Sequence, residues 1–207
     1  MGLSDDNFGG VDQARPLGKT VGQRGGIVRS ERVTSRGTRA VPLADLKAEL
    51  RIEHSEEDAR LQRILEAATA NVENSYGLAA GEQRLVIGVE GLGTPFRLPR
   101  VPASEIIEVK GGNNPAGLVP LDLGRFRLGP AGNELRVKDG LFRFDYHSVT
   151  FDAGYPARGE DVPPNLTEGI LLAAVDLYES GGVEDAGTDR LPVGARALLQ
   201  EFRHLSI

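Results

Sequence analysis

The sequence predicts an α+β protein. It should form a small bundle of helices, made of an N-terminal helix pair and C-terminal helices, with an inserted, mainly antiparallel β region and an extended N-terminal arm. Residues 41–76 and 165–179 repeat their apolar positions with the spacing of amphipathic or buried helices. Residues 82–155 alternate apolar and polar side chains, as strands do. Residues 1–40 show neither period, which predicts an arm.

The arm, residues 1–40, contains eight glycines and carries seven basic against four acidic side chains, a net charge of +3. The rest of the chain holds 17 basic and 26 acidic side chains, a net charge of −9. Such a segment buries too little apolar surface to order itself, so we expect partners to order it. Attraction to an acidic face of a neighbouring subunit follows from its charge. The expected contact residues are Arg24, Ile27, Val28, Arg29, Arg32 and Arg36, with Ile27 and Val28 adding a short strand to a sheet edge.

Two helices are predicted next, over residues 42–51 and 56–76. Pro42 suits the first turn of a helix. Ser55 is a good N-cap before an acidic first turn, and Gly77 supplies the C-cap of the second helix. The second helix carries a continuous apolar stripe, formed by Leu61, Ile64, Leu65, Ala68, Val72 and Tyr76.

Short strands fill residues 82–155, separated by turns rich in glycine, proline and asparagine. Strands this short and this closely joined must be mainly antiparallel. The alternating apolar sets are Leu85-Ile87-Val89, Phe96-Leu98, Ile107-Val109, Phe126-Leu128, Leu135-Val137 and Val149-Phe151-Ala153.

The last helices divide into a buried one and a docking one. The helix over residues 165–179 is apolar on most sides, so it should lie at the centre of the helical packing and complete a central domain, residues 41–180. Residues 181–207 read as a linker and a short C-terminal docking helix with an exposed apolar face. A helix of this kind binds by laying one face in a groove. The expected partner-interface residues are Leu191, Pro192, Leu198, Leu199, Phe202 and Arg203.

The sequence offers little for chemistry. It has no cysteine, so a disulfide or a thiolate metal site is excluded. Gly18-Lys19-Thr20 lacks the upstream glycine and the strand that a phosphate-binding loop needs. The three histidines have no partners at metal-ligand spacing. We therefore predict no catalytic residue, no cofactor and no metal. No run approaches the length of a membrane span, and no signal peptide is visible at the start.

The order and spacing of these segments resemble the head–tail connector (adaptor) proteins of tailed phages and gene transfer agents. The resemblance covers about residues 41 to 205. Its front is the helix pair that ends at Gly77, its middle is Phe96–Pro102 followed by Ile106–Val109, and its close runs from Val149–Tyr155 through the helix 165–179 to the C-terminus. The quoted closing segments are Val162-Pro163, Ile170–Ala174, Leu177-Tyr178-Glu179, Leu191-Pro192 and Leu198–Arg203.

The resemblance implies a structural subunit, not an enzyme. It implies a ring, expected to be a dodecamer, fixed beneath the portal protein, with a tail-side stopper or neck protein below and the capsid as a further possible contact. The protein would be made in the bacterial cytoplasm and would act in the neck of the particle, with DNA passing through the bore without specific binding. Two alternatives stay open: another neck protein, such as a stopper or tail terminator, or a nucleic-acid-binding module that uses the basic arm.

Overall fold

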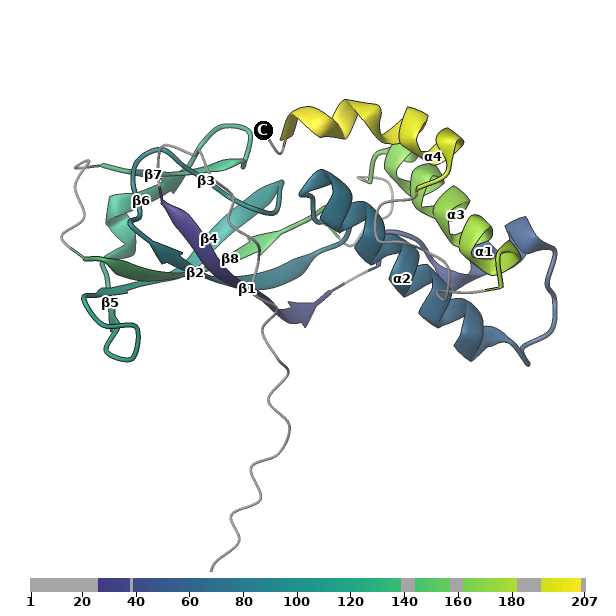
Figure 1. Ribbon diagram of the computed structural model, residues 1–207, viewed down its shortest axis with the longest axis horizontal. Helices are drawn as coiled ribbons and strands as arrows, with labels where there is room; N and C mark the ends of the chain where they lie inside the picture. The colour runs from purple at the N-terminus through teal and green to yellow at the C-terminus, as the bar shows by residue number, and fades with distance from the viewer. Residues whose placement is uncertain (1–25, 38, 139–143, 157–161, 182–190, 206–207) are drawn as a thin grey trace, which may run out of the picture.

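The chain folds into a helical lobe and a β lobe that lie side by side (Figure 1). This computed structural model describes residues 26–37, 39–138, 144–156, 162–181 and 191–205. Each lobe has its own apolar core. The α+β class predicted from the sequence is confirmed. Within the described ranges, no helix has the length and apolar content of a membrane span.

Four α-helices build the helical lobe: α1 (Leu43–Leu50), α2 (Asp58–Tyr76), α3 (Pro164–Glu179) and α4 (Val193–Leu198), with a 3₁₀ helix, η2 (Leu199–Leu205), after α4. Helix α3 packs against α1, α2, α4 and η2. A helix that is apolar on most sides needs covering on most sides, and α3 is the centre of the bundle as predicted.

The residues at its two ends determine where α2 begins and stops. Its predicted apolar stripe is buried, and Gly77 ends it in the left-handed conformation at φ 62°. The helix begins at Asp58, and its N-cap is Glu57. The expected cap at Ser55 is therefore wrong: the Ser55 carbonyl accepts from the Asp58 amide at 3.2 Å, which makes a turn before the helix.

The β lobe contains a five-stranded antiparallel sheet in the order β1-β2-β8-β4-β5. Its strands are β1 (Ile27–Arg36), β2 (Gln83–Glu90), β4 (Ala103–Gly112), β5 (Val119–Pro120) and β8 (Tyr146–Ala153). The alternation predicted for β2 and β8 is confirmed, because Leu85 pairs with Phe151 and Ile87 with Val149, all buried.

A second sheet of three strands has the order β3-β7-β6. Its strands are β3 (Phe96–Arg97), β6 (Phe126–Leu128) and β7 (Glu134–Val137), and a 3₁₀ turn, η1 (Leu123–Arg125), leads into β6. The buried side chains of this sheet share one core with the inner face of the larger sheet. The β lobe is therefore a sandwich of unequal layers.

Strand β1 differs from the expectation of an arm that reaches residue 40. Residues 27–36 pair with β2 of the same chain, with Val28 opposite Val89 and Val33 opposite Leu85. The register shifts twice along the strand, between Val28 and Ser30 and between Val33 and Ser35. Because of these shifts, apolar and polar residues do not alternate regularly along residues 27–36, and the sequence pattern does not predict a strand there. The described part of the chain begins at residue 26.

Candidate interaction surfaces

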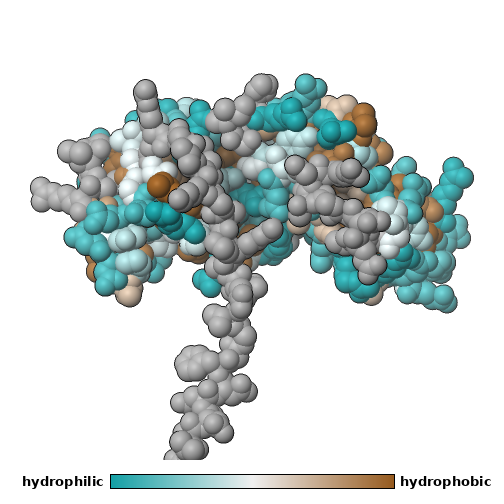
Figure 2. Space-filling model, viewed as in Figure 1, coloured by the Kyte–Doolittle hydropathy of each residue, from teal (hydrophilic) through white to brown (hydrophobic). Residues whose placement is uncertain are grey.

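The described residues contain no group of three or more His, Asp or Glu side chains placed to hold a metal ion. His54 is exposed in the turn before α2, while His147 is buried in β8. Burial lowers the pKa of His147, because the charged imidazolium loses its hydration. Figure 2 shows that the visible face is mostly hydrophilic, with apolar colour in separate spots.

The C-terminal segment does not present the expected apolar face. Leu191, Leu199 and Phe202 are all buried in the helical core, and Leu199 is fully covered. Leu198 and Pro192 are half-buried, so Arg203 is the only one of the six expected interface residues that is exposed. The expectation of an exposed Leu198-Leu199-Phe202 face is wrong, because the apolar face of α4 and η2 covers α3 and contacts α2 of the same chain.

A glycine makes this packing close. A Cβ placed on Gly169 of α3 would lie 2.7 Å from Cγ and 2.8 Å from Cδ2 of Leu199. Only a residue without a side chain lets η2 approach α3 at this point. Asn165 of α3 also donates to the Glu201 carboxylate at 2.8 Å, which ties the same elements at the surface. The C-terminal segment is thus an integral part of the bundle.

Three arginines that were assigned to the arm pair with carboxylates of their own chain. Arg29 pairs with Glu90 across the β1–β2 ladder. Arg36 lies 3.6 Å from Glu73 of α2. Arg39, just after β1, lies 3.1 Å from Glu66. Arg24 lies outside the described residues.

These ion pairs change the interpretation of the net charge of +3 on residues 1–40. Residues 26–40 hold four arginines and one glutamate, whereas residues 1–25 hold three basic and three acidic side chains. The whole net charge of +3 therefore belongs to β1 and the residues that follow it, and most of it is matched within the monomer. Ile27 and Val28 pair with β2 of the same chain, so they do not extend the sheet of a neighbouring subunit in this structure. Arg32 is exposed on β1.

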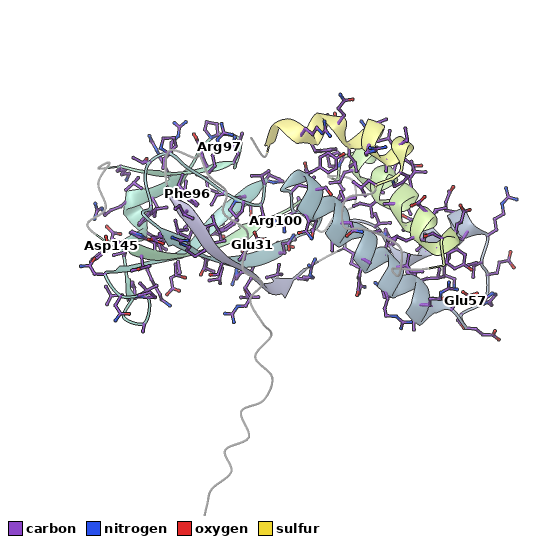
Figure 3. All side chains as sticks on the ribbon, viewed as in Figure 1. Glu31, Glu57, Phe96, Arg97, Arg100 and Asp145 are labelled. Carbon is purple, nitrogen blue, oxygen red and sulfur yellow. The ribbon has the colours of Figure 1, made fainter. Side chains whose placement is uncertain are left out.

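Arg100 joins the two lobes (Figure 3). Its Nε donates to Glu31 Oε1 of β1 at 2.6 Å, and its Nη2 donates to Asn74 Oδ1 of α2 at 2.5 Å. Its Nη1 also reaches the Leu78 carbonyl at 3.4 Å. The side chains of Arg100 and Glu31 are mostly buried, so this pair is less screened by water than a surface ion pair. One arginine thus fixes a strand, a helix and the turn between the lobes.

Glu73 is the second residue that fixes the junction. It is a buried carboxylate on α2. Its Oε1 accepts from the Ala80 amide at 3.0 Å and from Gln83 Nε2 at 2.9 Å. It was not singled out from the sequence, although an acidic residue beside the apolar stripe of a helix is a usable signal of a buried hydrogen-bonding role.

A groove of about 800 Å³ runs beside this junction, between α2 and the segment that joins β1 to α1. Leu65 and Val41 are among its apolar lining, and the Arg36–Glu73 and Arg39–Glu66 pairs border it. Four of the five charged residues in its lining are therefore paired with one another.

The outer face of the five-stranded sheet, opposite the small sheet, is polar. Arg84 makes a two-point contact with Asp152 of the neighbouring strand, at 2.7 and 2.8 Å. Lys110 pairs with Glu108 at 2.8 Å on β4. Ser30, Gly88 and Ser148 form a row of small residues across three strands of this face. The outer face therefore combines matched charges with a row of small side chains.

The front of the chain is similar to a known protein family. Residues 41–99 match the family model described as phage gp6-like head-tail connector protein. This segment contains α1, α2, β2 and β3. Among curated protein sequences, none matches the chain. The family resemblance inferred from sequence is confirmed.

Solved structures with the same fold extend the likeness to most of the chain. A chain from "Neck of empty GTA particle computed with C6 symmetry" has a TM-score of 0.66 and 22% identity, over 82% of this chain and 94% of that one. A chain from "Virion of native gene transfer agent (GTA) particle" has a TM-score of 0.67 and 22% identity, over 84% and 94%. A chain from "Neck of native GTA particle computed with C12 symmetry" has a TM-score of 0.61 and 22% identity, over 83% and 94%.

Proposed function

We propose that this chain is a structural head–tail connector (adaptor) subunit, which assembles as a ring beneath the portal of a phage or phage-like particle. The observation that carries the proposal is the combination of a connector-family match over residues 41–99 with a fold shared, over more than four fifths of the chain, with subunits of a gene transfer agent neck. The chain would act in the particle neck and join the DNA-filled head to the tail.

The expected copy number is twelve. One of the similar chains comes from a neck computed with twelve-fold symmetry and another from a neck computed with six-fold symmetry, and a dodecamer is compatible with both. The partners would be other copies of this chain, the portal protein and a tail-side stopper or neck protein. Such a subunit needs complementary surfaces and not a catalytic group, so we propose no enzymatic activity.

The C-terminal segment offers a surface for a portal contact. Because Leu199 and Phe202 are buried, the exposed Arg203 and the exposed residues of α4 are the parts of the C-terminal segment that a partner can reach without unfolding it. Val193, at the start of α4, is 74% exposed and supplies an apolar side chain there. A portal contact on this surface would bury that side chain.

Two alternatives are less well supported. A nucleic-acid-binding module would need free basic side chains in the arm, yet Arg29, Arg36 and Arg39 pair with carboxylates of the same chain. A stopper or tail terminator should be dominated by sheet, whereas half of this molecule is a helical lobe built around α3.

A gene-deletion experiment tests the proposal. Particles produced without this chain should accumulate as heads that lack tails, with free tails beside them in electron micrographs. Supplying the chain in trans should restore joined particles. Tailed particles that form at the normal yield without this chain would overturn the proposed function.

A further inference from the structure

The outer face of the small sheet carries a concentration of positive charge. Alternation along β3, β7 and β6 sends Phe96, Leu135, Val137 and Phe126 into the core. The opposite face carries Arg97, Arg127, Arg136 and Glu134, and Lys138 follows at the end of β7. We call these five residues the basic face. It holds four basic side chains and one carboxylate, a net charge of +3.

The arrangement of the basic face is unfavourable for an isolated monomer. Arg127 lies directly opposite Arg136 in the β6–β7 ladder, and like charges in that position destabilise a sheet. Arg136 pairs with Glu134. Among the residues that the structure describes, Arg97, Arg127 and Lys138 have no ion-pair partner. A negative partner outside the monomer would relieve this repulsion.

A complementary surface lies at the other end of the molecule. Residues 45–58 comprise most of α1, the turn after it and the first residue of α2. They hold six acidic and two basic side chains, a net charge of −4. Asp45, Glu49, Glu53 and Glu56 are exposed and have no ion-pair partner among the described residues. We call residues 45–58 the acidic tip. In Figure 1 the small sheet and the α1–α2 turn lie toward opposite ends of the long axis.

We propose that the basic face of one subunit docks on the acidic tip of the next copy, so that this head-to-tail contact builds the ring. The inference rests on the proposed function and names the interface that the ring would use. A contact between two different surfaces of the same chain closes into a ring when the rotation between neighbours permits it. Opposite charges on the two surfaces also speed the encounter and set the orientation of the pair.

The mixed signs on each surface favour a protein partner over DNA. Glu134 lies across the ladder from Arg97 and beside Arg136, where its carboxylate would repel a phosphate backbone. The acidic tip carries a matching exception, because Arg51 is exposed at the end of α1 and has no ion-pair partner among the described residues. The basic face also contains no aromatic side chain on which a base could stack.

Charge reversal with rescue tests this interface. The face variant is Arg127→Glu with Lys138→Glu, and the tip variant is Glu49→Lys with Glu53→Lys. Each should weaken association between copies by about tenfold or more at low salt, measured by sedimentation of the purified protein and by counting rings on portal complexes. The chain with all four changes, and an equal mixture of the two variants, should both recover association. All four side chains are exposed, so each variant should fold. The tip variant should keep the wild-type denaturation midpoint, and the face variant should not fall below it, because Arg127→Glu removes the like-charge pair with Arg136.

A matched control and a DNA-binding measurement separate the possible outcomes. Arg32→Glu with Arg63→Glu makes the same change of charge as the face variant, at exposed positions outside both surfaces and outside α4, and should leave association unchanged. Full assembly by the face variant, or failure of the fourfold variant to recover it, would overturn this interface while leaving the proposed function intact. A face variant that assembles but loses salt-dependent binding of duplex DNA would instead assign the basic face to DNA. Wild-type protein that forms no ring with the portal would contradict the proposed function itself.

Discussion

The contact between Gly169 of α3 and Leu199 of η2 decides whether the C-terminal segment is core or free surface. Leu199 is fully buried, so Leu199→Ala should lower the free energy of unfolding by about 2–5 kcal/mol. Gly169→Ala should cost roughly 1–3 kcal/mol, because the new methyl group would lie 2.7 Å from Leu199 Cγ.

The double variant makes the prediction sharper, because the two effects should not add. Once Leu199 is truncated, the methyl group of Gly169→Ala has room, and alanine is favoured over glycine inside a helix by about 0.5–1 kcal/mol. Gly169→Ala should therefore destabilise the wild-type chain and stabilise the Leu199→Ala chain. The coupling energy should be roughly 2–3 kcal/mol.

Urea denaturation of the four chains, followed by circular dichroism, measures the cycle. Val193→Ala is the control on the same segment, since Val193 is 74% exposed and its truncation should change stability by less than about 0.5 kcal/mol. If Leu199→Ala were as harmless as Val193→Ala and instead abolished portal attachment, the C-terminal segment would be a free docking face and its place in the bundle would be refuted.

Three further predictions concern the junction, the arm and pH. Glu73→Ala should lower the free energy of unfolding by about 2–4 kcal/mol in urea denaturation, because the buried Ala80 amide and Gln83 side chain lose their acceptor. The control Glu66→Ala, on the exposed side of the same helix, should lower it by under about 1 kcal/mol. Deleting residues 1–25 should leave the denaturation midpoint unchanged. Deleting residues 1–38 should lower the midpoint strongly, because β1 and the Glu31–Arg100 pair are lost. Equal midpoints of the two truncated chains would show that β1 does not stabilise the sheet. Burial holds the pKa of His147 below its ordinary value of 6.5, so the unfolded chain binds more protons than the folded chain once the pH falls below that value. The free energy of unfolding should therefore decrease as the pH is lowered through 6.5, and less steeply in His147→Gln. Identical slopes in the two chains would contradict this origin.

The sequence predicted those elements whose partners are local. The stripe of α2 and its glycine cap depend on a single helix, and the alternation of β2 and β8 depends on one sheet face, so both could be read from the chain. β1 could not be read, because it is a charged edge strand with two register shifts and few apolar residues. Charged side chains on an edge strand prevent pairing with other chains, and they also make the strand resemble an arm.

The candidate surfaces were harder to predict, because the sequence shows which faces are apolar but not what covers them. The apolar face of α4 and η2 was expected to meet a partner, and the nearly all-apolar α3 was expected to need covering. In the structure the apolar face of α4 and η2 covers α3, and the two meet at the Gly169–Leu199 contact. The charge asymmetry was likewise real, but Arg29, Arg36 and Arg39 find their carboxylates in the same chain. Only the three-dimensional structure places Arg127 opposite Arg136.

The central claim is that this chain is the subunit of a ring at the head–tail junction. Electron cryomicroscopy of the chain bound to its cognate portal tests it most directly, with end-on projections aligned and no symmetry imposed. We expect a closed ring of about twelve two-lobed subunits on one end of the portal, in line with the C12 neck that holds a chain of the same fold. A monomer or a two-fold dimer that persists in the presence of the portal would contradict the claim, even if the purified chain alone were monomeric.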